Sequence, residues 1–424
     1  MKKFNLKHIQ KYKSLLESFF SLSILNGINA ILPLVTLPYI LRVVGVANYG
    51  VYAYVYVIIQ YVLLMTSYGF NYSATKQISQ NRDDLEKINV IYNNVIYARL
   101  ILFGISILLL ALLSPLLFEN KVSLVMTFLG LGVVLGDIFS PIWLFQGLEK
   151  MRYFTITNVV AKVLFTLLIF IFIQSPDDYV YIILFNSLGY LISGIIGIII
   201  ANRLFNVRLS SPSLQQIIIQ YREGCTMFVS TIGMNLYRNA NIFILKFFVD
   251  DTFLGIYAAS EKLIKGLQSL TTPISQAFFP HFGHVFKQNS IKQNLLRLKQ
   301  ITLSLAVVFF ILFIGTFVAS PLLVAFLYGS KDLTAILIVR IMSPVLLFGG
   351  INYILGIVGL VNLDQQKKFS AGVIISGITG IVFLFITISY WTIYAAAWSM
   401  LLSELVLFVI CLISIMSYSK RIQE

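Results

Sequence analysis

Long apolar stretches follow one another along nearly the whole chain, and short polar gaps separate them. A helix needs about 20 apolar residues to cross the hydrocarbon core of a bilayer, and backbone groups in lipid must be hydrogen-bonded within their own segment. The pattern therefore predicts an all-α polytopic membrane protein with about twelve spanning helices. The expected spans are 17–41, 46–70, 90–113, 122–145, 154–174, 179–201, 222–248, 252–279, 300–320, 333–360, 369–390 and 393–416.

The composition agrees with this interpretation. Of the 424 residues, 58% are hydrophobic and 11% are charged, and the mean hydropathy is +0.88. Soluble domains have roughly a quarter of their residues charged. The polar gaps are at most roughly 25 residues long, which is too short for a folded domain outside the membrane. The function is therefore expected to reside within the bilayer.

Lys and Arg residues concentrate in every second gap between the predicted helices. Of the 31 Lys and Arg residues, the intervening gaps hold only Arg42, Lys121 and Lys331, beside several acidic residues. Because positively charged loops stay on the cytoplasmic side, both termini are predicted to be cytoplasmic. The net charge of +14 then reflects topology and does not indicate nucleic-acid binding.

An internal repeat accompanies this topology. The tetrapeptide GVYA at 50–53 recurs as GIYA at 255–258, and GLE at 147–149 is matched by NLD at 362–364, each pair at corresponding places in the two halves. An even number of helices per half means that both halves insert the same way, as in transporters with parallel repeats. We expect two six-helix lobes, at 1–202 and 222–424, joined by a cytoplasmic linker at 203–221.

Several cations fall inside the predicted spans: Arg99, Lys162, Arg238, Lys246, Lys262, Lys265 and Arg340. Each costs about 2.5 to 3.5 kcal/mol near a helix centre, so it needs water, a partner or a path for its head group to the interface. A hydrated, cationic cavity would meet this need. Its candidate lining residues are Arg238, Lys262, Lys265, Arg99, Lys162, Arg340, Asn26 and Asn29.

Other interpretations of these residues stay open. Glu261, Lys262 and Lys265 share an arc of about 100° on one predicted helix, but Glu261 and Lys265 can also form an internal ion pair. Arg99, Lys162 and Arg340 can pair or extend to the interface instead. The amides near Asn26 and Arg238 can hold helices together without lining a cavity.

Three carboxylates within the spans, Asp137, Glu404 and Glu261, are candidates for coupling transport to H⁺ or Na⁺, because a buried carboxyl group can bind and release a proton. Asp137 can instead neutralise Arg99 or Lys162, and Glu404 can make a polar contact within a packed helix. No phosphate-binding GxxxxGK loop occurs in the sequence. The sequence gives no indication of a catalytic site, a metal or a cofactor.

Several short motifs of the sequence carry a family resemblance. Asn26, the segment PYILRVVG at 38–45, Tyr49-Gly50, YGF at 68–70 and PIWLFQG at 141–147 resemble the polysaccharide repeat-unit flippases. These are the O-antigen, or Wzx-type, members of the multidrug/oligosaccharidyl-lipid/polysaccharide exporter superfamily. The resemblance extends over essentially the full length, and its sharpest motifs lie in the N-terminal half.

The resemblance implies that the protein moves an undecaprenyl-pyrophosphate-linked oligosaccharide from the cytoplasmic to the periplasmic leaflet of the bacterial inner membrane. Two lobes would rock around a central cavity by alternating access, and Arg42 would lie where a gate closes, unless it is a simple interfacial anchor. The expected partners are the lipid-linked oligosaccharide, membrane lipids, H⁺ or Na⁺ as a coupling ion, and polysaccharide polymerase or assembly proteins.

Rival functions differ in the charge they require. A lipid II or teichoic-acid-type exporter would need the same cations, whereas a cation-coupled multidrug exporter would favour acidic residues. A membrane glycosyltransferase would need a sizeable outer loop, and a scaffold without transport would leave the buried charges unexplained. Because cations outnumber carboxylates within the spans, an anionic cargo is favoured.

Overall fold

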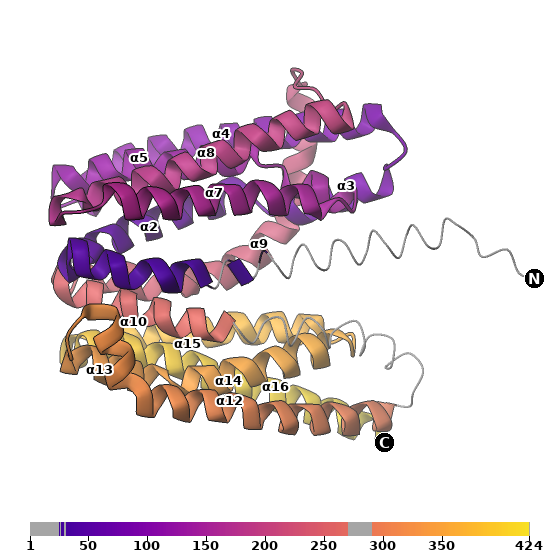
Figure 1. The fold of residues 1–424 in the computed structure, drawn as a ribbon. Coiled ribbons are helices and arrows are strands. Elements are labelled where there is room, and N and C mark those ends of the chain that lie inside the picture. The colour runs from indigo at the N-terminus through magenta and orange to yellow at the C-terminus, as the bar shows by residue number, and fades with distance from the viewer. Residues whose placement is uncertain (1–24, 26, 29–30, 270–290, 424) are drawn as a thin grey trace, which may run out of the picture. The chain divides into compact units, whose positions relative to one another are not determined.

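The structure of the protein is a computed structural model that describes residues 25, 27–28, 31–269 and 291–423. Within these ranges every regular element is a helix (Figure 1). The chain forms two compact units, one made of residues 1–32 and 54–232 and the other of residues 33–53 and 233–424. The domain boundaries expected at 202 and 222 remain predictions.

The first unit is built from long helices and short connections. After α2 (Val46–Ser67), which belongs to it from residue 54 onward, come α3 (Phe70–Gln80), α4 (Leu85–Leu117), α5 (Lys121–Phe139), α6 (Ile142–Gly147), α7 (Met151–Phe172), the short 3₁₀ helix η1 (Pro176–Asp178), α8 (Tyr179–Phe205) and the first part of α9 (Leu214–Leu245).

The second unit begins with the helical segment Ile31–Val44 from Pro33 onward and includes the first two turns of α2. It continues through the end of α9, α10 (Asp251–Ser269), α12 (Ile291–Tyr328), α13 (Leu333–Met342), α14 (Pro344–Tyr353), the π-helix η2 (Ile354–Val361), α15 (Gln366–Trp391) and α16 (Ile393–Gln423).

The described residues contain nine helices that are long and apolar enough to cross a membrane. The all-α polytopic fold is thereby confirmed, while the count of twelve spans and the side on which the termini lie remain predictions. Some spans are not the single straight helices that hydropathy suggests. Tyr68 and Gly69 adopt positive φ values of 40° and 73° and separate α2 from α3, and Pro344 opens a new helix directly after α13.

Side-chain caps set several helix starts. The carboxylate of Asp84 accepts a hydrogen bond from the backbone N–H of Lys87 at the start of α4, and the Asn120 side chain accepts one from Ser123 at the start of α5. Both satisfy backbone donors that have no partner inside the helix. The Lys87 N–H bond also lowers the pKa of Asp84, since it stabilises the charged form.

Close helix contacts in the first unit rely on glycine. A Cβ atom on Gly136 of α5 would overlap the backbone of Tyr190 on α8, and one on Gly194 of α8 would lie 2.6 Å from the carbonyl oxygen of Gly136. Lipid tails are as apolar as the side chains, so membrane helices associate through close packing rather than through the hydrophobic effect. The small residues let the α5 and α8 backbones touch.

The same device joins the two copies of the repeated tetrapeptide. A Cβ atom on Gly50 of α2 would overlap the carbonyl oxygen of Asp251, and one on Gly255 of α10 would overlap that of Val46. Each of these carbonyls lies four residues before the partner glycine. The first turns of α2 and α10 therefore cross in a reciprocal way, and each copy of the motif provides the surface on which the other packs.

The crossing predicts that a Gly→Ala substitution changes the free energy of unfolding in opposite directions at different glycines. Gly50→Ala and Gly255→Ala should lower the free energy of unfolding by about 1 to 3 kcal/mol, because the backbones must separate. Gly104→Ala and Gly315→Ala, where a Cβ atom meets nothing within 4 Å, should raise it by about 0.5 to 1 kcal/mol. Thermal unfolding of the purified variants measures both. Equal effects at all four positions would contradict the crossing.

Candidate functional site

The acidic and basic arc expected on α10 is present in the second unit. Lys265 Nζ lies 3.0 Å from Glu261 Oε1, and the Glu261 side chain is 6% exposed while that of Lys265 is 38% exposed. Lys262 lies between them in sequence, with its Nζ 5.8 Å from the centre of the Tyr49 ring. Tyr49 directly precedes the crossing glycine Gly50, so the close contact of α2 with α10 places an aromatic face against a half-buried ammonium.

A buried polar chain continues from this arc into the second unit. The Tyr257 hydroxyl, one turn before Glu261 on α10, accepts a bond of 2.9 Å from Asn241 Nδ2. Ser399 Oγ lies 3.4 Å from Asn241 Oδ1 and donates to the Gly380 carbonyl oxygen at 2.8 Å. This chain joins α9, α10, α15 and α16. Asn241 therefore holds helices together, which is one of the two roles the sequence left open for the amides of this helix.

Sequence reasoning missed Tyr257 and Ser399 as members of this chain. The spacing of four residues between Tyr257 and Glu261 is a usable signal, because such positions face the same side of a helix. The position of Ser399 depends on how α16 packs, and nothing in the local sequence reports it.

Arg42, the expected gate residue, caps the C-terminal end of α12. Its Nη2 donates to the carbonyl oxygens of Phe326 and Ala325, and its guanidinium carbon lies 5.9 Å from the centre of the Phe326 ring. A cation at the C-terminus of a helix is favoured by the helix dipole and satisfies carbonyls that have no partner inside the helix. Arg42 thus fixes the segment Ile31–Val44 to α12, and its gating role stays a prediction.

In the first unit, Arg99 and Asp137 form an ion pair between α4 and α5. Arg99 is 1% exposed, and its Nη2 donates to the Asp137 carboxylate. Nη1 reaches the Asp137 carbonyl oxygen at 3.1 Å, and Nε reaches that of Thr66 at 3.3 Å. Of the roles considered for Asp137, this geometry supports neutralisation of Arg99. The same contacts favour packing over cavity lining for Arg99.

The other candidate residues have contacts of their own. Arg340 on α13 donates from Nε to Ser320 Oγ at 3.0 Å and stacks over Phe317, both on α12. Lys162 lies half-buried on α7 of the first unit. Asn26 and Asn29 fall outside the described residues, and for Arg238 only the helical backbone of α9 is described.

Glu404, the remaining carboxylate, lies on α16 beside α14. Its Oε2 accepts a 2.7 Å hydrogen bond from Asn352 Nδ2, and the same amide nitrogen reaches the Glu404 carbonyl oxygen at 2.9 Å. Asn352 is 3% exposed. A carboxylate within a membrane span is therefore held by a neutral amide donor. The contact can persist in both protonation states, because a protonated carboxyl group still has an oxygen that accepts a hydrogen bond.

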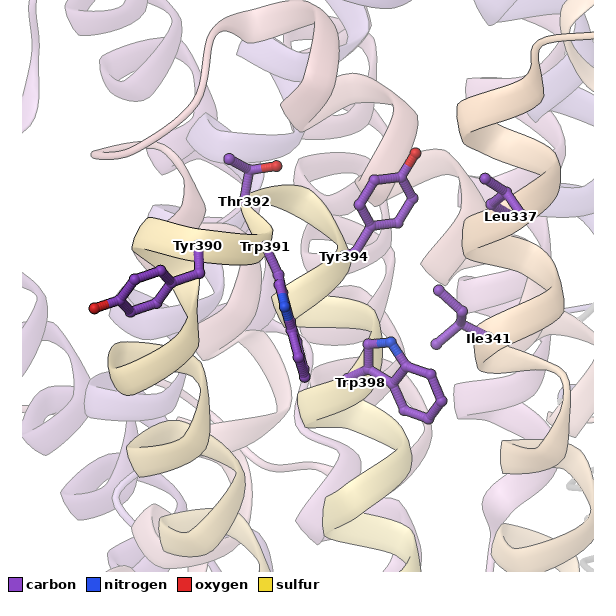
Figure 2. A pocket seen from close by; sticks show the side chains of 7 residues that line it. All are labelled: Leu337, Ile341, Tyr390, Trp391, Thr392, Tyr394 and Trp398. Carbon is purple, nitrogen blue, oxygen red and sulfur yellow. The ribbon is translucent and has the colours of Figure 1, made fainter.

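A pocket of about 460 Å³ lies where α15 turns into α16 beside α13. Figure 2 shows the side chains that line it. The lining residues are Leu337, Ile341, Tyr390, Trp391, Thr392, Tyr394 and Trp398. None of them is charged, so this pocket is unsuited to a phosphate group. Tyr and Trp gathered at the end of apolar helices are typical of the belt that lies at a membrane interface.

No group of three or more His, Cys, Asp or Glu side chains that could hold a metal occurs among the described residues.

Solved membrane transporters share this fold. A lipid II flippase, MurJ, in an inward closed conformation superimposes with a TM-score of 0.74 at 14% identity, covering 92% of this chain and 86% of that one. A multidrug resistance MATE family transporter of the MOP superfamily gives 0.67 at 12% identity, covering 92% and 99%. At such identities these similarities show the fold alone.

The sequence identifies the family. The family model for polysaccharide biosynthesis proteins matches residues 15–286 of the sequence, and the chain belongs to that family. A protein named "Putative O-antigen transporter" from Escherichia coli (strain K12) is 28% identical over 392 residues, covering 92% of this chain and 94% of its own length. The resemblance inferred from the motifs is confirmed, and the chain is a multi-pass protein of the bacterial inner membrane.

The Arg99–Asp137 pair leads to a prediction about stability. Asp137→Asn leaves a buried guanidinium without its counter-charge, and the free energy of unfolding should fall by about 3 to 5 kcal/mol. Asp84→Asn is the matched control. Its pair with Lys87 is exposed at 3.1 Å, and Asn is an equally good helix cap, so it should change little. Thermal unfolding of both variants in detergent measures the difference. Similar stability for both would show that Asp137 is not the essential partner of Arg99.

Proposed function

We propose that the protein is a flippase for a lipid-linked oligosaccharide. It moves an undecaprenyl-pyrophosphate-linked repeat unit from the cytoplasmic to the periplasmic leaflet by alternating access of two lobes. Membership of the polysaccharide biosynthesis family supports this function, as does the relative named for O-antigen transport. The observation that carries the proposal is the arc of Glu261, Lys262 and Lys265, which holds two lysines about one turn apart on α10.

The contacts of Lys262 suit a cargo that binds and leaves. A cation over an aromatic ring gains about 0.5 to 2 kcal/mol, whereas a hydrogen bond between charged groups contributes about 1.5 to 3 kcal/mol. Phosphate oxygens can therefore compete with the Tyr49 ring for the ammonium. Lys265 has its charge balanced by Glu261, so the arc carries a net positive charge without two uncompensated cations.

Charge favours this cargo over that of the rival transporters. A multidrug exporter that carries cationic drugs would need acidic groups where this chain has Lys262 and Lys265. A lipid II or teichoic-acid-type exporter would use the same cations, because those substrates also carry phosphate. The alternative cargo is thus another polyprenyl-linked glycan, and the family match favours polysaccharide repeat units.

Accumulation of the cargo in the periplasmic leaflet needs a source of energy, and we include coupling to H⁺ or Na⁺ in the proposal. Asp137 and Glu261 each hold a cationic partner. Glu404 accepts from the neutral amide of Asn352. A carboxylate in that setting is the better candidate to exchange an ion during the cycle.

Complementation tests the function. In a flippase-null host, the wild-type chain should restore display of surface polysaccharide. Lys262→Ala and Arg238→Ala should reduce display at least tenfold and accumulate lipid-linked repeat units, since about 1.4 kcal/mol of lost binding is a factor of ten. Lys121→Ala, an exposed lysine at the start of α5, is the matched control. Full display by the α10 and α9 variants would refute the cationic site, and drug resistance without display would favour a multidrug exporter.

Coupling has its own test. In proteoliposomes loaded with the lipid-linked repeat unit, Glu404→Gln should flip substrate at a rate that no longer rises when a proton or sodium gradient is imposed. The amide oxygen of Gln can still accept from Asn352, so the fold should persist. Wild type assayed with and without each gradient gives the reference, and a gradient response that survives the substitution removes Glu404 from the coupling mechanism.

A further inference from the structure

A polar stripe runs along α7 in the first unit. Asn158, Lys162 and Thr166 are spaced four residues apart, so successive members are offset by about 40° around the helix and the stripe extends for about 12 Å. Gly189 of the neighbouring helix α8 faces the Ala161 carbonyl oxygen and the Phe165 side chain, which border this stripe. The stripe lies in the middle of an apolar span from Met151 to Phe172.

Two atoms of the stripe lack hydrogen-bond partners. Asn158 Oδ1 and Thr166 Oγ1 are both buried, and neither has a partner in the described part of the chain. Other threonines in these helices bond to the preceding turn, as Thr157 Oγ1 does with the Phe154 carbonyl oxygen at 2.9 Å. An unsatisfied buried polar atom destabilises a fold, and in a native protein it calls for an explanation.

Their chemistry indicates what would satisfy them. An amide oxygen accepts a hydrogen bond from a hydroxyl group, a threonine hydroxyl donates one to a phosphate oxygen, and the lysine one turn from each supplies a positive charge. A ligand with phosphate oxygens next to sugar hydroxyls matches all three groups. A purely apolar ligand matches none of them.

We propose that Asn158, Lys162 and Thr166 form a binding station in the first unit for the phosphate–sugar junction of the cargo. Lys162 and Thr166 bind phosphate oxygens, and Asn158 accepts from a hydroxyl of the first sugar. This inference rests on the proposed function and adds two residues that charge alone does not single out. It also gives the first unit a substrate contact of its own, separate from the α10 arc of the second unit.

Ligand-induced thermal stabilisation of the full-length protein in detergent tests the station, because a ligand that binds only the folded state raises Tm. The probes are undecaprenyl pyrophosphate and the same lipid carrying one sugar. Lys162→Met should weaken binding of both probes about tenfold or more, and Thr166→Val about three- to tenfold. Asn158→Leu should weaken only the sugar-bearing probe. Lys162→Arg, which keeps the charge, should retain binding.

A stability readout separates binding from packing. Thr166→Val removes a buried hydroxyl that lacks a partner, so the ligand-free protein should unfold at or above the wild-type Tm while its response to ligand falls. Thr157→Val, which loses a made hydrogen bond, should lower the ligand-free Tm and leave ligand affinity unchanged. If Thr166 had only a structural role, Thr166→Val would likewise lower the ligand-free Tm and leave ligand affinity unchanged.

Two outcomes would overturn the inference. One is wild-type affinity for both probes in folded Lys162→Met and Thr166→Val proteins. The other is a lower ligand-free Tm for Thr166→Val with unchanged affinity. Failure of the proposed function looks different: wild-type protein would then fail to restore polysaccharide display and would not be stabilised by either probe.

Discussion

The dominant constraint on this molecule is the cost of charge in a low-dielectric membrane interior. The structure meets it in distinct ways. Arg99 is enclosed by a carboxylate and two carbonyl oxygens, and Arg340 donates to the Ser320 hydroxyl on a neighbouring helix. Lys265 is balanced by Glu261, whereas Lys262 faces the ring of Tyr49. The first two arrangements use geometry that is costly to disturb. The contact with an aromatic ring can be exchanged, which makes Lys262 suited to a changing partner.

Packing and chemistry meet at the crossing of α2 and α10. Without side chains at Gly50 and Gly255 the two backbones touch, and this proximity brings Tyr49 to Lys262. The same α10 helix carries Tyr257, which links the arc to the polar chain through Asn241. The substrate site proposed in the second unit thus depends on a contact that contains no polar side chain. Small residues supply the position, and the charged residues supply the chemistry.

Much of the fold could be predicted from sequence, because hydropathy is a local property that each apolar run carries by itself. The break at Tyr68 and Gly69 was missed, since a left-handed turn leaves the hydropathy unchanged. The sequence alone does not decide whether Asp137 neutralises a nearby cation such as Arg99 or couples transport to an ion. The hydrogen bonds of Arg42 to a helix end more than 280 residues away could not be read at all. Such pairs depend on helix rotation and register, which only packing determines.

The reciprocal glycine crossing also bears on how the chain can have evolved. Each copy of the repeated tetrapeptide packs against the turn that precedes the other copy. The carbonyl opposite Gly50 belongs to the turn before Gly255, and the carbonyl opposite Gly255 belongs to the turn before Gly50. A larger residue in one copy would remove the space that the other copy requires. A hybrid of halves from distant relatives would therefore have to preserve that match.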